Sequence, residues 1–210
     1  YYLEEMSTIA LKYGATIDKY IGDAIMIFFG DPDSQGVAED AIRCVTMATD
    51  MQQRLEELSD TWGQFGLQAP FSMRIGINTG YCTVGNFGSE NRMDYTVIGA
   101  GVNMASRLES AAESGTILLS YDTYNLIKDT IPCVEADRIK LKGIANPART
   151  FRVLKDQEQG SVISIKTDNA HFHTVLSALS VDEASALKLS LEESLDTLNA
   201  HLKSEPKVAS

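Results

Sequence analysis

Polar side chains able to hold a phosphate group are concentrated in one short segment of the chain. Asn103 and Arg107 lie four residues apart in a stretch whose pattern predicts a helix over 100–112, so both side chains face the same way. This predicted helix begins between Gly99 and Gly101, where free backbone N–H groups favour an anion. An amide and a guanidinium beside such a helix start could bind a phosphorylated ligand. A helix cap followed by a surface arginine would explain the same residues.

Three further basic residues and one acid are candidates for the same chemistry. Lys19 and Asp23 flank the tip of a predicted hairpin, Arg74 lies in the strand-like segment FSMRIGIN, and Lys142 lies in KLKGI. Taken singly, the first two are typical of a solvated turn, and Lys142 is typical of a charge on an edge strand. The chain has neither a GxGxxG fingerprint nor a GxxxxGK[ST] phosphate loop. The individual motifs are therefore weak evidence for a nucleotide site.

The periodicity of apolar residues predicts the elements that must position these side chains. A helix over 1–13, ending at Gly14, precedes a hairpin over 16–30 with Ile17, Ile21, Ile25 and Ile27 on its buried face. A helix over 37–58, strands within 71–88 and 89–99, the helix over 100–112, a strand at 116–120, a short helix and two last strands follow. This interleaved order predicts an α/β sandwich with a mixed sheet and with the helices on one face.

Composition and charge limit the class of protein. The 210 residues suit one domain with an appendage, and a net charge of −11 gives no field that would attract nucleic acid. Three cysteines without metal-ligand spacing favour a reducing, cytoplasmic compartment. No apolar run approaches the length of a membrane helix. We therefore expect neither a nucleic-acid partner nor a membrane segment in this chain.

The last quarter of the sequence differs in composition from the rest. We expect a domain over 1–155 and, over 156–210, a linker with one amphipathic helix. Ser180 and Glu183 form a capping-box pattern before that helix, and its leucines alternate four and three residues apart. Two heptads are too few for a typical coiled coil, so docking of this helix on its own domain is favoured over a coiled-coil seam.

Four motifs in order resemble one family. KYIGDAIM, MRIGINTGYCTVGNFG, DYTVIGAGVNMASRLE and LKGI resemble the class III nucleotidyl cyclase catalytic domain, most closely the bacterial, cyanobacterial-type adenylate cyclases. The resemblance covers about residues 1–155 and implies a ferredoxin-like βαββαβ core that acts as a head-to-tail homodimer. It also identifies GNFGSENRMDY with the family's dimer arm, where an ordinary long hairpin is the alternative.

The resemblance assigns roles to the candidate residues. In this family two carboxylates hold two divalent ions, Mg²⁺ or Mn²⁺; Asp23 matches the second carboxylate, and the first belongs to an F-x-D-I motif upstream of residue 1. We therefore expect an N-terminally truncated domain whose opening strand is missing. Arg74 would meet the triphosphate, and the partner protomer would bring Asn103 to the ribose, Arg107 to the α-phosphate and Lys142 to the terminal phosphates.

Two residues imply the choice of base. Lys19 can donate to N1 of adenine, and Thr96 can accept from its exocyclic amine. A Lys/Thr pair resembles bacterial adenylate cyclases, whereas guanylate cyclases typically carry Glu and a small residue such as Cys. The sequence therefore predicts ATP as substrate and cyclic AMP as product.

Other readings of the same chain remain. The missing carboxylate leaves open a non-catalytic or regulatory cyclase-homology module that dimerises for a partner, and a guanylate cyclase is a further alternative. A diguanylate cyclase is disfavoured because no GG[DE]EF run appears. Cyclases of this type usually receive their signal from an upstream sensor domain, which we expect in the full-length protein.

Overall fold

The structure is a computed structural model that describes residues 1–64, 71–139, 147–155, 158, 162–166, 171–176 and 179–204. It divides into two compact units, Tyr1–Leu154 and Lys155–Ser210, and each is described by itself. The first unit contains, in chain order, α1 (Tyr2–Lys12), β1 (Thr16–Ile21), β2 (Ala24–Phe28), α2 (Val37–Gln64), β3 (Ile75–Ile77), β4 (Thr83–Ser89), β5 (Arg92–Ile98), α3 (Ala100–Ala111), β6 (Ile117–Ser120), α4 (Tyr121–Ile127), β7 (Cys133–Ile139) and β8 (Ala148–Val153). This order is the predicted one.

A four-stranded mixed sheet lies at the centre of the first unit. Its strand order is β3-β6-β8-β7, with β3 and β6 parallel and the other neighbours antiparallel. The chain leaves β3, forms the hairpin β4–β5 and returns through the helix α3 to β6. This long connection is the crossover that the parallel pair β3–β6 needs. The predicted α/β fold with a mixed sheet is confirmed.

Helices cover both faces of this sheet, so the expectation of helices on one face was wrong. Ile117 and Leu119 of β6 pack in a cluster with residues of α2 and α4. Leu118, which points the opposite way in the pleat, packs with Leu108 and Ala112 of α3 and its end. All four β6 residues are buried because each face of the strand meets a helix.

The β1–β2 hairpin is held by a second cluster, formed with α1 and α2. Met6 of α1 and Met51 of α2 are buried there, with Ile17, Ile25 and Ile27 packed against them. The predicted turn is present, and Gly22 adopts φ +64°, a conformation that favours glycine. Ile21 was predicted on the buried face, but it is 59% exposed because it lies at the free tip of the hairpin.

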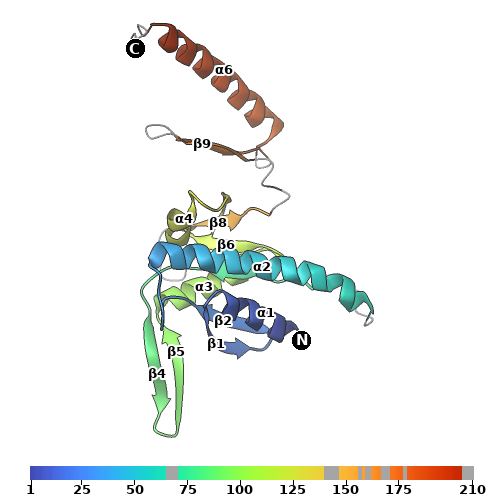
Figure 1. Cartoon of the computed structure of the whole chain (residues 1–210), viewed down its shortest axis with the longest axis vertical. Coiled ribbons are helices and arrows are strands. Elements are labelled where there is room, and N and C mark those ends of the chain that lie inside the picture. Colours follow the sequence, from blue (N-terminus) through green and yellow to red (C-terminus); the bar gives the residue numbers. More distant parts are fainter. Residues whose placement is uncertain are drawn as a thin grey trace, which may run out of the picture. The chain divides into compact units, whose positions relative to one another are not determined.

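The strands β4 and β5 form a separate antiparallel hairpin. They pair residue for residue from Thr83 opposite Ile98 to Ser89 opposite Arg92. Figure 1 shows this hairpin extending away from the rest of the first unit. Met93 and Tyr95 on β5 are 58% and 50% exposed, so the hairpin presents large apolar side chains to the solvent.

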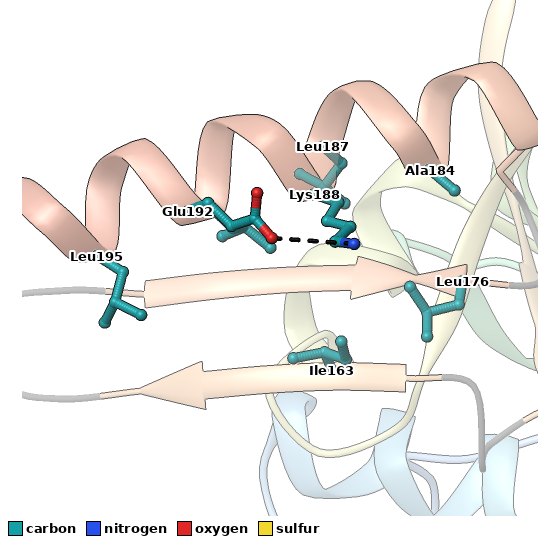
Figure 2. A pocket seen from close by; sticks show the side chains of 8 residues that line it. Ile163, Leu176, Ala184, Leu187, Lys188, Glu192 and Leu195 are labelled. Carbon is teal, nitrogen blue, oxygen red and sulfur yellow. Dashed lines mark ion pairs between the residues drawn. The ribbon is translucent and has the colours of Figure 1, made fainter.

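The second unit consists of a hairpin and a helix: β9 (Val162–Lys166), β10 (His171–Val175) and α6 (Val181–Ser204). The hairpin was missed in the sequence because the segment shows little periodicity. The capping box is confirmed: Glu183 accepts hydrogen bonds from the backbone N–H and hydroxyl of Ser180 at 2.8 and 2.7 Å. Figure 2 shows Ile163 and Leu176 beneath α6, where they line an apolar groove with leucines of the helix.

One glycine determines how closely α3 approaches the sheet. A Cβ atom at Gly76 of β3 would lie 2.1 Å from the backbone N of Glu109 and 2.3 Å from the carbonyl O of Ala105. Both neighbours are helix backbone, so only a shift of α3 could make room. Gly76 is therefore required for the position of the helix that carries Asn103 and Arg107.

The variant Gly76→Ala is expected to lower the free energy of unfolding by roughly 1–3 kcal/mol through overpacking. Chemical denaturation of both proteins measures this loss. Gly85→Ala is the matched control, because its nearest neighbour is a flexible side-chain atom, Cε2 of Phe87, at 3.8 Å. Equal losses in the two variants would show that α3 does not rest on Gly76.

Candidate active site

Asp23 lies at the turn between β1 and β2, next to Gly22. The residue is exposed, and its negative charge interacts electrostatically with the side chain of Tyr2 on α1. Burial raises the pKa of Tyr2, and the charge of Asp23 raises it further. The hairpin tip thus presents an exposed carboxylate that a ligand can reach from the solvent side.

Lys19 lies on β1 beside an acid that the sequence analysis did not select. Its Nζ atom is 3.3 Å from Oδ2 of Asp18. The Lys19 side chain is 46% exposed, whereas that of Asp18 is 0% exposed. Sequence reasoning missed Asp18, because neighbouring side chains of a regular strand point to opposite faces and nothing in the run TIDKYI pairs this acid with Lys19.

Thr96 lies on β5 and is buried, with 7% of its surface exposed. Its hydroxyl has no hydrogen-bond partner among the described residues. The strands β1 and β5 contact each other, so Lys19 and Thr96 belong to adjoining elements of one protomer. The neighbouring Tyr95 donates a hydrogen bond to the carboxylate of Asp31, which raises the pKa of Tyr95 and ties β5 to the loop after β2.

Asn103 and Arg107 lie on α3 and are both exposed. Within the described part of the chain, Arg107 forms no ion pair or hydrogen bond, so its guanidinium is available to a ligand. The start of α3 is packed against the loop after β3: Asn78 donates to the carbonyl of Gly101 at 3.2 Å. A Cβ atom at Gly101 would lie 2.8 Å from Sγ of Cys82, which explains the small residue here.

Arg74 precedes β3, which is an edge strand among the described elements, and is 47% exposed rather than inside a central strand. Its guanidinium forms an ion pair with Glu109 of α3 at 3.0 Å. Such an exposed pair stabilises the fold little, so a triphosphate could compete for Arg74. Lys142 lies outside the described residues, and its predicted role stays a prediction.

The described residues therefore fall into two groups. Lys19 and Thr96 lie on adjoining strands, while Asn103 and Arg107 share the exposed side of α3, which follows β5 directly. No cluster of three or more Asp, Glu, His or Cys side chains suited to a metal occurs in the described ranges. Nor does any helix in those ranges have the length and apolarity needed to cross a membrane.

The mixed sheet, the glycine turn before Asp23 and the exposed polar residues of α3 are the features expected of a nucleotidyl cyclase domain. Residues 3–155 match the family described as the adenylate and guanylate cyclase catalytic domain, and the chain belongs to this family. The predicted resemblance to class III cyclases is confirmed.

Some similar proteins are named adenylate cyclases, and others are named guanylate cyclases. The crystal structure of the adenylyl cyclase CyaB from P. aeruginosa is 53% identical, with a TM-score of 0.72, over 74% of this chain and 79% of that one. The guanylyl cyclase Cya2 is 38% identical, with a TM-score of 0.68, over 73% and 77%. The adenylate cyclase of Anabaena cylindrica is 40% identical over 112 residues, 51% of this chain and 21% of that protein.

The curated relatives are much longer than the part that matches. The chain spans 7%, 21% and 24% of the adenylate cyclases of Dictyostelium discoideum, Anabaena cylindrica and Rhizobium meliloti. The match therefore concerns only a part of each of those proteins.

Proposed function

We propose that the chain is an adenylate cyclase, which converts ATP to 3′,5′-cyclic AMP and pyrophosphate. The observation that carries the proposal is the pair Lys19 and Thr96 on the adjoining strands β1 and β5. The ammonium of Lys19 can donate to N1 of adenine, but it would face the N1–H of guanine. The oxygen of Thr96 can accept from the adenine amine, and its lack of a partner among described residues leaves that oxygen available.

The exposed polar face of α3 suits the phosphate and ribose of the same substrate. In the reaction, the ribose 3′-oxygen bonds to the α-phosphorus, and the bond to the pyrophosphate oxygen breaks. Arg107 neutralises the charge that develops on the α-phosphate, and Asn103 orients the ribose. Arg74 and Lys142 hold the remaining phosphates. The free guanidinium of Arg107 supports this assignment.

The donor atoms at the hairpin tip fit a divalent cation that is completed by substrate. Asp23 offers one exposed carboxylate, and Mg²⁺ is usually held by one or two carboxylates together with phosphate oxygens and water. When bound, two Mg²⁺ or Mn²⁺ ions would lower the pKa of the 3′-hydroxyl and neutralise the triphosphate. Asp31 makes a poorer ligand, because its carboxylate already accepts from Tyr95.

A head-to-tail homodimer would complete two equivalent sites. Asp23 and Arg74 of one protomer would then face Asn103, Arg107 and Lys142 of its partner. The exposed Met93 and Tyr95 on the projecting β4–β5 hairpin support a partner surface there. An upstream sensor domain that controls this dimer remains part of the proposal.

Incubation of the purified protein, as its gene encodes it, with Mn²⁺ and either ATP or GTP tests the proposed function. We expect cyclic AMP from ATP and little cyclic GMP from GTP, because the Lys19 ammonium opposes guanine N1–H. Mass spectrometry of the products measures both. A folded dimer that makes neither product would be a regulatory module, and one that makes only cyclic GMP would be a guanylate cyclase.

A further inference from the structure

The carboxylate of Asp18 is buried in the first unit without a hydrogen-bond partner. Its side chain is 0% exposed, and neither Oδ1 nor Oδ2 accepts a hydrogen bond from any residue in the described ranges. A buried carboxylate that lacks such partners lowers the stability of a fold. A native protein that keeps such a group needs a reason for it, and a role at a functional site is one such reason.

The backbone around Asp18 is also irregular. The register of β1 against β2 shifts between Ile17 and Lys19, so that Ile17 pairs with Ile27 while Lys19 pairs with Met26, and Asp18 is the extra residue. In a regular strand, neighbouring side chains point to opposite faces. The bulge removes this alternation, which allows Asp18 and Lys19 to meet at 3.3 Å. Bulges beside active sites commonly re-aim a side chain in this way.

The ion pair restricts a side chain that is otherwise mobile. Lysine has a flexible four-carbon stem and loses much rotamer freedom when its ammonium is fixed. Asp18 is short, and its burial holds it in place, so it can anchor the ammonium of Lys19 from the inside. The ammonium then lies against the Asp18 carboxylate on one side, and its exposed side faces the solvent.

We infer that Asp18 is a positioning residue that aims the Lys19 ammonium at N1 of the substrate base and so contributes to the choice of adenine over guanine. The inference rests on the proposed function of Lys19. Asp18 does not touch the base; it acts through Lys19. The unpartnered hydroxyl of Thr96 on the adjoining strand supports a base-binding surface at this place.

The variant Asp18→Asn keeps the shape of the side chain and removes its charge. We expect the ratio of kcat/KM for ATP to that for GTP to fall roughly tenfold, because a poorly aimed ammonium no longer discriminates between the bases. In a Lys19→Met background, Asp18→Asn should leave this ratio unchanged, since the residue that it positions is gone. Asp18→Ala gives a second test of the same loss.

Asp40→Asn is the matched control, because it also removes a buried carboxylate. Asp40 is 7% exposed, and the backbone N–H of Gln35 donates to it at 3.1 Å at the start of α2. Asp40→Asn should reduce thermal stability without changing the ATP/GTP ratio. Two results would overturn the inference. One is a wild-type ATP/GTP ratio of kcat/KM in Asp18→Asn. The other is that Asp18→Asn changes this ratio as much in the Lys19→Met background as in the wild type.

Acylation of Lys19, followed by peptide mass analysis, gives a readout that does not depend on turnover. We expect faster labelling in Asp18→Asn than in the wild type, because the amine is no longer held. If the wild type makes no cyclic AMP, the proposed function fails. The labelling rates then still test whether Asp18 restricts the Lys19 side chain. Equal labelling in the two proteins would overturn the role of Asp18 whatever the activity.

Discussion

Replacing Arg107 by alanine is expected to lower the rate of cyclic AMP formation by roughly 10²–10³-fold, the usual cost of removing a donor that stabilises transition-state charge. The structure supports a large effect, because Arg107 is exposed on α3 and, in the part of the chain that is described, no carboxylate neutralises it. Steady-state assays with saturating ATP measure the loss in kcat. Arg138→Ala, which removes another exposed arginine on β7, is the control and should retain activity.

A mixture of two inactive variants tests whether the site is shared between protomers. Asp23→Asn and Arg107→Ala would each inactivate both sites of their own homodimer. In a heterodimer, one of the two sites is intact. It contains Asp23 of the Arg107→Ala chain and Arg107 of the Asp23→Asn chain. Random exchange should therefore restore about a quarter of the wild-type activity, because half of the dimers have one intact site out of two.

The control for this experiment is a mixture in which exchange is prevented by chemical cross-linking beforehand, which should stay inactive. Native mass spectrometry shows how much heterodimer has formed. A confirmed heterodimer without activity would mean that Asp23 and Arg107 do not act in one site across the interface, and the dimer proposal would fall.

The elements of the first unit were predictable because each depends on local signals. Apolar periodicity indicated α1 and α2, and the glycine at the hairpin turn separated β1 from β2. The placement of helices on both faces of the sheet depends on contacts between distant segments. The run Ile117–Leu118–Leu119 contained the missing information, because a strand that is apolar at every position is buried on both faces.

Candidate site residues could be selected from the sequence only where a residue type has an evident chemical use. Lys19, Thr96, Asn103 and Arg107 can each contact a nucleotide, and the order of the motifs resembled a family. Asp18 makes no such contact, and its relation to Lys19 arises from a bulge that the sequence does not reveal. In a regular strand the two side chains would point apart, so adjacency in sequence argued against their pairing.

The double variant Lys19→Glu with Thr96→Cys is expected to reduce the preference for ATP over GTP by roughly 10²-fold, since each unpaired buried polar group costs about 1–3 kcal/mol. Glutamate can accept from N1–H and the 2-amino group of guanine, and it leaves N1 of adenine without a donor. The burial of Thr96 strengthens the effect, because water has little access to a group left unpaired there. Competition assays with both nucleotides and separate detection of cyclic AMP and cyclic GMP measure the preference.

The same chemical changes at an exposed place provide the control for base recognition. Lys128→Glu with Thr130→Cys makes the same two changes just after α4, where Lys128 is exposed and donates a hydrogen bond to Asn125 at 2.9 Å. That variant should keep the wild-type preference, because neither side chain lies on β1 or β5. If the folded Lys19→Glu with Thr96→Cys variant also keeps the wild-type preference for ATP, then Lys19 on β1 and Thr96 on β5 do not determine which base is bound. The specificity of the domain would then come from residues other than the pair on which the adenylate assignment depends.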